Sequence, residues 1–139
     1  MGQYGTTAIE AIKLLKSGYK SAEQAWRESA EKHILAKSSR NKGCPRQAFL
    51  GLCASGLVVG VSPNTCTKLI SSLNGEYSVT AVRLLVRDPN LVQKGKSKLW
   101  QKVLSEIPNT NPKKKHNEQM DVVMALWEQN LIVIDREAI

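Results

Sequence analysis

Four basic residues surround the start of a strongly apolar segment: Lys37, Arg40, Lys42 and Arg46. The segment, residues 45–55, begins with a proline, which favours a first helical turn, and a glycine suited to ending a helix follows it. Unpaired amides and the helix dipole make such an N-terminus attractive to anions. We therefore expect phosphate binding there. The alternative is a solvated basic loop, because neither Walker nor Rossmann glycine spacing is present.

A second group of basic residues lies later in the chain: Lys94, Lys96, Lys98 and Lys102. A run of three lysines, residues 113–115, follows in a stretch that we expect to be an exposed linker. Lysines that neutralise phosphates bind nucleic acids with little sequence selectivity and with a strong dependence on salt. The two groups together predict contacts to a polyanion, whereas a solvated charged surface is the alternative for each.

Aromatic residues that could stack on bases are few in this chain. Stacking requires exposed rings. We expect exposure for the tyrosines, which fall near helix ends or turns: Tyr4, Tyr19 and Tyr77. We expect burial for the tryptophans, which fall on the inner faces of predicted helices: Trp26, Trp100 and Trp127. Phosphate contacts are therefore the main expected mode of binding.

Cys44 is a weak candidate for nucleophilic catalysis. It lies at the predicted helix N-terminus between Lys42 and Arg46, and positive charge and the helix dipole both favour the reactive thiolate. Catalysis also needs a base, and neither histidine, His33 or His116, can be placed beside Cys44 from the sequence. The alternative is a purely structural cysteine. The three cysteines show no pairwise chelating spacing, so no metal site and no cofactor are predicted.

The length and composition indicate one globular domain covering residues 1–139. The formal net charge is +8, unevenly spread. Residues 1–115 carry 19 basic against 7 acidic side chains, an excess of 12, and residues 116–139 carry 1 against 5. A positive body with an acidic C-terminal part would attract phosphate polymers or acidic proteins. No apolar run approaches the ~20 residues that cross a bilayer, and we expect a cytoplasmic protein with reduced thiols and no membrane contact.

The apolar periodicity predicts an all-α fold: a compact bundle of six or seven short helices around the central apolar helix 45–55. A short C-terminal strand, formed by residues 131–134, is a further option. The expected helices run from Thr6 or Thr7 to Gly18, then over 21–37, 45–55, 63–73, 78–87, 99–107 and 117–130. Segments 44–55 and 63–73 resemble a helix-turn-helix superficially, but the seven residues between them exceed the ~3–4 of that turn.

These patterns favour a non-catalytic domain that binds a polyanion, most plausibly nucleic acid. Two alternatives stay open. One is a protein-interaction module or homodimer that uses the acidic C-terminal helix. The other is an enzyme that acts on a phosphorylated small molecule through Cys44.

Overall fold

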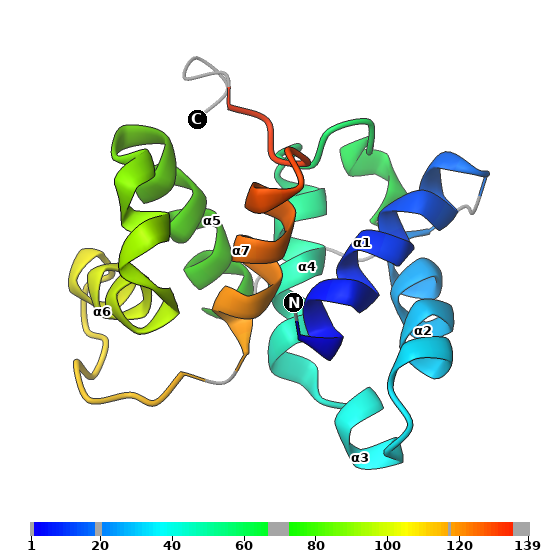
Figure 1. Cartoon of the computed structure of the whole chain (residues 1–139), viewed down its shortest axis with the longest axis horizontal. Coiled ribbons are helices and arrows are strands. Elements are labelled where there is room, and N and C mark those ends of the chain that lie inside the picture. The colour runs from blue at the N-terminus through cyan, green and yellow to red at the C-terminus, as the bar shows by residue number, and fades with distance from the viewer. Residues whose placement is uncertain (1, 19–20, 67–72, 117, 135–139) are drawn as a thin grey trace.

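The computed structural model describes residues 2–18, 21–66, 73–116 and 118–134. Over these ranges the protein is a bundle of seven α-helices without a β-strand (Figure 1). The elements, with η for a short 3-10 helix, are α1 (Gln3–Lys16), α2 (Ala22–His33), α3 (Lys37–Arg40), α4 (Gly43–Ala54), η1 (Pro63–Thr65), α5 (Leu73–Arg87), η2 (Pro89–Lys94), α6 (Lys96–Glu106) and α7 (Gln119–Glu128). The predicted all-α class is confirmed.

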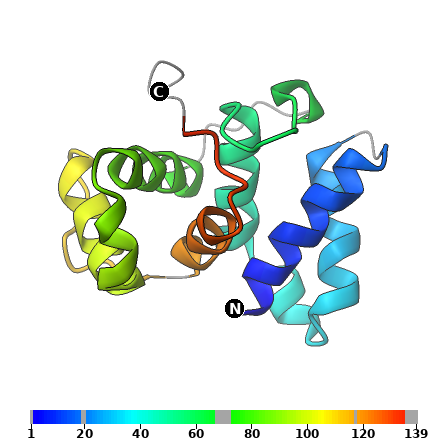
Figure 2. The same cartoon turned by 45° about the horizontal axis from the view of Figure 1, so that its top comes forward.

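Helices α4 and α7 share the centre of the bundle. In Figures 1 and 2 they lie between α5 and α6 on one side and α1, α2 and α3 on the other. The side chains of Phe49 and Leu52 on α4 are fully buried, and the ring centroid of Phe49 lies 5.3 Å from that of Trp26 on α2. The central position predicted for segment 45–55 is confirmed.

Helix α7 is buried over a wider surface than its predicted apolar stripe. Val122 and Leu126 are fully buried, whereas Met124 and Trp127, which the periodicity places inside, are only half-buried. The reason is that α7 contacts α1, α4, α5 and α6, so that neighbours surround most of its circumference. A helix that is enclosed in this way buries apolar residues outside a single stripe.

Two glycines allow α4 and α5 to approach each other closely. A Cβ added at Gly51 would lie only 2.5 Å from the Cα of Gly75. Near this crossing the hydroxyl of Ser78 donates a hydrogen bond to the carbonyl of Ala48 at 2.8 Å. The interruption predicted between helices 63–73 and 78–87 is therefore wrong. Helix α5, which the structure describes from Leu73 to Arg87, runs through Gly75 and Ser78, because Gly75 serves helix packing and Ser78 joins the two helices.

The chain after α4 differs from the predicted helix 63–73. The Ser62 hydroxyl accepts the N–H of Asn64 at 3.2 Å, so the predicted start signal is present, but it begins only the single turn η1. Cys66 has extended backbone, with φ −84° and ψ 111°, and its thiol donates to the Leu50 carbonyl. An α-helix therefore does not continue through Cys66. The remainder of the predicted helix, residues 67–72, lies outside the described ranges.

Several other helix boundaries also shift. Helix α1 begins at Gln3, earlier than expected. Thr7 does not cap this helix, because its hydroxyl donates within the helix to the Gln3 carbonyl at 2.8 Å. The predicted capping serine of α2 is confirmed: Ser21 accepts the Gln24 N–H at 3.1 Å. Helix α2 ends at His33, and the predicted basic linker contains the short helix α3.

The strand considered for residues 131–134 is not formed, but this segment contacts the connection after α4. Val58 and Ile132 form an isolated antiparallel bridge. The Val59 amide donates to the Leu131 carbonyl, and the Val133 amide donates to the Leu57 carbonyl, each at 2.8 Å. These bonds hold the end of α4 and the end of α7 together without forming a strand.

Candidate functional site

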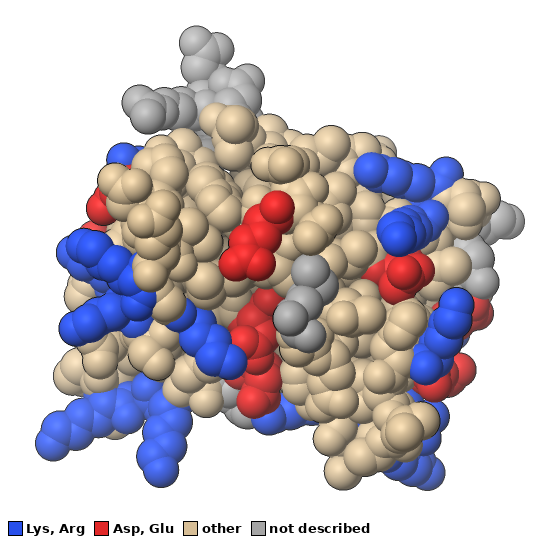
Figure 3. All heavy atoms as spheres, in the orientation of Figure 1, with Lys and Arg blue, Asp and Glu red and all other residues tan. Residues whose placement is uncertain are grey.

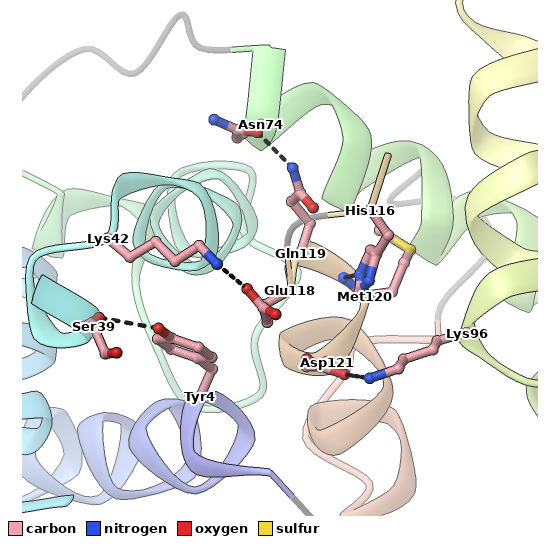
Figure 4. Close-up of polar contacts among 10 residues, drawn as sticks. All are labelled: Tyr4, Ser39, Lys42, Asn74, Lys96, His116, Glu118, Gln119, Met120 and Asp121. Atoms are coloured by element: carbon pink, nitrogen blue, oxygen red, sulfur yellow. Dashed lines mark hydrogen bonds and ion pairs between the residues drawn. The ribbon is translucent and has the colours of Figure 1, made fainter. Parts of the chain in front are cut away.

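The N-terminal ends of α4, α5 and α7 meet in one polar cluster, which we define as Lys42, Asn74, His116, Glu118 and Gln119 (Figure 4). Lys42 is the residue before α4, Asn74 lies in the first turn of α5, and the other three residues lead into α7. The first amides of a helix lack partners within the helix and need acceptors from outside it. The cluster brings three such helix starts together in a small volume.

A chain of amide hydrogen bonds crosses this cluster. The Gln119 side chain, which is only 1% exposed, donates through Nε2 to Oδ1 of Asn74 at 2.8 Å. Nδ2 of Asn74 in turn donates to Oε1 of Gln47 on α4, also at 2.8 Å. Because buried amides are costly when they lack partners, this chain fixes the relative position of α4, α5 and α7.

Lys42 is held by an ion pair with Glu118. The hydrogen bond that Lys42 donates to the carboxylate of Glu118 raises the pKa of Lys42 above its ordinary value, against a smaller opposing effect of burial. The ammonium also lies 5.9 Å from the ring centroid of Tyr4, whose hydroxyl donates to the Ser39 carbonyl at 3.1 Å (Figure 4). The charge of Lys42 is therefore engaged inside the protein, and it contributes less to binding an external anion than the sequence predicts.

His116 caps α7. Its Nε2 accepts the backbone N–H of Met120 at 2.8 Å, so this ring nitrogen carries no proton. Burial lowers the pKa of His116 below its ordinary value of 6.5, with Asp121 the largest opposing influence. The imidazole also packs edge-on against Trp100, with ring centroids 5.5 Å apart. The predicted loop position of His116 is correct, and the structure adds that its basic nitrogen has a structural partner.

The predicted residues of the first basic group take different positions. Lys37 is exposed on α3, whereas Arg40, Lys42 and Arg46 are partly buried. The Nε of Arg40 is buried without a hydrogen-bond partner among the described residues. This group therefore offers fewer accessible charges than four unrestrained cations would.

The second basic group is more open. Lys94, Lys98 and Lys102 are exposed on η2 and α6, and Lys96 bonds to Oδ1 of Asp121 on α7 at 2.7 Å. The lysines at 113–115 are exposed as well. Nε1 of Trp100 donates to the carbonyl of Lys114 at 2.8 Å, which ties this linker to α6. We call Lys94, Lys98, Lys102 and residues 113–115 the basic end.

Figure 3 shows how charge is distributed on one face of the molecule. Blue side chains gather over α6 and the linker after it, with red side chains only at the margin of that group. Over α1, α2 and α3, blue and red side chains alternate. Red side chains over α7 separate the two regions. On this face the structure does not bring the two basic groups into one patch.

Cys44, the weak catalytic candidate, is half-buried in the first turn of α4. His33 is half-buried at the end of α2, and Nε2 of His116 is engaged by Met120. Within the described ranges, no group of three or more His, Cys, Asp or Glu side chains is placed to hold a metal ion.

The expected exposure of the tyrosines is wrong for two of them. Tyr4 is 6% exposed, and Tyr77 is fully buried with its ring centroid 4.9 Å from that of Trp100. Both rings fill space between helices, so neither is available to stack on a base. Tyr19 lies outside the described ranges. The expected burial of Trp26 and Trp100 is correct, and Trp127 is half-buried.

No local sequence pattern marks Asn74, Gln119 or Asp121 as partners in this region. A polar residue at position 119, followed by apolar residues, resembles the solvent side of an amphipathic helix. Asn74 next to a glycine resembles a turn. Only long-range contacts distinguish these hydrogen-bonded amides from surface ones, because Gln119 and Asn74 are 45 positions apart.

The protein is thus an all-α bundle with a polar cluster at three helix starts and an exposed basic end. Residues 1–133 match the model of a family of unknown function, DUF6979, and the chain belongs to that family. No match was found among curated proteins or among solved structures. Across the described ranges, no helix is both long and apolar enough to cross a bilayer.

Proposed function

We propose that the protein binds a polyanion, with the phosphate backbone of a nucleic acid as the ligand, through the basic end. The observation that carries the proposal is the hydrogen bond from Trp100 to the carbonyl of Lys114, which keeps the linker lysines beside the lysines of α6. The linker that carries Lys113, Lys114 and Lys115 therefore lies against α6, which carries Lys98 and Lys102. Lys94 lies just before α6, and all six of these lysines are exposed.

The character of these side chains favours backbone contacts over base recognition. Lysine is a flexible point charge, suited to phosphate but not to the bidentate recognition of a base edge. The aromatic rings nearest to the basic end, Trp100 and Tyr77, are buried and not available for stacking. The proposed binding is therefore electrostatic and weakly selective for sequence, and it does not require a catalytic role for Cys44.

The test is the salt dependence of binding. Short duplex DNA, single-stranded DNA and RNA probes are titrated by fluorescence anisotropy over a range of salt concentrations. For duplex DNA, the slope of log K against log salt is about −0.9 for each phosphate contacted. Substitution of Lys98, Lys102 and Lys114 by glutamine should reduce the magnitude of that slope by as much as about 3 × 0.9.

A matched control removes the same charge elsewhere. Lys13, Lys16 and Lys32 are exposed on α1 and α2, so their triple glutamine variant has the same net charge as the variant of the basic end. The control should keep the wild-type slope. If the two variants bound the probes equally weakly, net charge alone would account for the binding. Absence of binding to every probe at low salt would contradict the proposal outright.

A further inference from the structure

Two cysteines lie together at the end of α4 that is remote from the polar cluster. Cys53 is in the last turn of α4 and is fully buried. Cys66 follows η1 and is half-buried against the core. A Cβ added at Gly56, just after α4, would meet Cγ of Pro63 at 3.4 Å, so η1 lies directly against the end of this helix.

The position of the Cys66 thiol follows from its contact with α4. Its Sγ donates to the carbonyl of Leu50 at 3.5 Å. In an α-helix the carbonyl of one residue points along the axis toward the residues three and four positions later, here Cys53 and Ala54. The Cys66 thiol therefore lies beside the turn that carries Cys53, where each thiol affects the pKa of the other.

The proximity of the two thiols shifts their pKa values in opposite directions. Hydrogen bonding from Cys53 lowers the pKa of Cys66, although burial and the carboxylate of Glu23 oppose the effect. The same hydrogen bond, together with burial, raises the pKa of Cys53 well above its ordinary value. The thiolate is the form that attacks peroxides and disulfides. The more accessible cysteine of the pair is thus also the more nucleophilic at neutral pH, and the buried one is held next to it.

We propose that Cys66 and Cys53 form a thiol-oxidation site, in which hydrogen peroxide converts the pair into a disulfide. In the first step the Cys66 thiolate attacks one peroxide oxygen, the O–O bond breaks, and a sulfenic acid forms at Cys66 as hydroxide leaves and is protonated to water. In the second step the sulfur of Cys53 attacks the sulfur of Cys66. The S–S bond forms as the S–O bond breaks, and the departing hydroxyl leaves as water with the proton of Cys53.

The two-electron oxidation of the thiol pair is balanced by reduction of the peroxide to two molecules of water. The disulfide would covalently join the segment after η1 to α4. It would close a loop that contains the extended residues bonded to Leu131 and Val133. A dithiol reductant would restore the two thiols. This site is separate from the basic end, so that its test is independent of the proposed polyanion binding.

The test uses the full-length reduced protein, treated with hydrogen peroxide, alkylated and digested for mass spectrometry. We expect a crosslinked peptide pair containing Cys53 and Cys66, which disappears after treatment with dithiothreitol. The Cys44→Ser variant is the matched control and should form the same crosslink. The variants Cys53→Ser and Cys66→Ser should both lose it completely. A folded wild-type protein that accumulates sulfinic acid at Cys66 without the crosslink would overturn the proposal.

A second measurement separates reactivity from packing. The rate of iodoacetamide alkylation at Cys66, followed against pH, should show a midpoint below the ordinary value of 9.0. Cys53→Ala removes the hydrogen-bond donor and should raise this midpoint, whereas Cys53→Ser keeps a donor and should leave it low. Thermal melts verify that each variant is folded. An unchanged midpoint in a folded Cys53→Ala protein would also overturn the proposal, because Cys53 would then not activate Cys66.

Discussion

The polar cluster and the basic end both contain lysine, but its surroundings differ between the two regions. Lys42 is paired with Glu118 at the meeting point of three helices, and about a third of its side chain is exposed. Lys98 and Lys102 project from α6 into solvent. An ammonium that already has a carboxylate partner must give up that partner to bind an external anion, whereas a solvated one only releases counterions. Whether a lysine can bind a ligand therefore depends on its surroundings in the folded protein and not only on its presence in the chain.

If the polar cluster has a structural role, its buried amide should matter most for stability. Gln119→Ala removes the donor to Asn74 and leaves a cavity beside a polar group. We expect the free energy of unfolding to fall by about 2–3 kcal/mol. Urea denaturation followed by circular dichroism measures it.

Gln129, which is exposed after the end of α7, provides the control for this substitution. Gln129→Ala should change the free energy of unfolding by less than about 0.5 kcal/mol. A similar loss in both variants would show that the amide chain across the cluster contributes nothing particular.

The cap formed by His116 predicts a smaller and pH-dependent effect. His116→Ala should destabilise the protein by about 1 kcal/mol at pH 8, because the Met120 amide loses its acceptor. The folded-state pKa of His116 lies below the ordinary value of 6.5. The wild-type contribution is therefore fully present above pH 6.5, and it is lost as the pH falls from 6.5 through the lower pKa of the folded state.

Denaturation curves measured between pH 8 and pH 5 test this dependence. The difference in unfolding free energy between wild type and His116→Ala should shrink as the pH falls. A difference that grows toward acid pH would mean that the charged imidazole is the form that stabilises the fold, contrary to the hydrogen bond from Met120.

The ion pair between Lys42 and Glu118 should contribute less to the free energy of unfolding than the hydrogen bonds of Gln119 and His116. Lys42→Gln is expected to cost at most about 1 kcal/mol, because the pair is partly solvated and water replaces much of the lost attraction. The pKa of Lys42 is raised in the folded protein, so the contribution of the pair is present at neutral pH and is lost only as the pH rises through that raised value.

A double-mutant cycle with Glu118→Gln isolates the energy of the pair. In nucleic-acid titrations, Lys42→Gln should leave the salt slope near its wild-type value. A reduction in that slope as large as that of a basic-end lysine would break the distinction between the two regions.

The smallest effect on stability is expected at the basic end. The Lys98, Lys102 and Lys114 triple glutamine variant should stay within about 0.5 kcal/mol of wild type in unfolding free energy. The same variant is the one expected to bind nucleic acid most weakly. A marked loss of stability would show that these lysines have structural partners, and the binding result would then need a variant that spares the fold.

Local sequence signals predicted which helices form better than they predicted the residues at which those helices begin and end. Ser21 caps α2 as expected, because a serine followed by Glu23 and Gln24 is a strong local start signal. Asn74, Gly75 and Ser78 indicated a break between two helices where α5 is continuous. The reason is that turns and helix-packing positions favour the same small residues. A glycine that ends a helix and a glycine that lets two helices cross look alike in the sequence. They differ in whether the backbone of another helix lies against the glycine, as Gly75 lies against Gly51.

The candidate site was predictable only in part. Lys42, Lys96 and the later lysines could be named as basic residues near helix starts, but their carboxylate partners are contributed by α7, whose path across the bundle no local pattern indicates. Glu118 and Asp121 appeared in the sequence as the outer face of a C-terminal helix. In the structure they neutralise one lysine from each basic group.

The all-α class, the enclosed position of α4 and the excess of positive charge follow from the amino-acid sequence, because periodicity, apolar content and composition are properties of neighbouring residues. Packing of the helices sets which lysines stay exposed, which amides are buried and which two of the three cysteines lie together. Those outcomes depend on contacts between residues far apart in the chain, and such contacts form only when the helices pack.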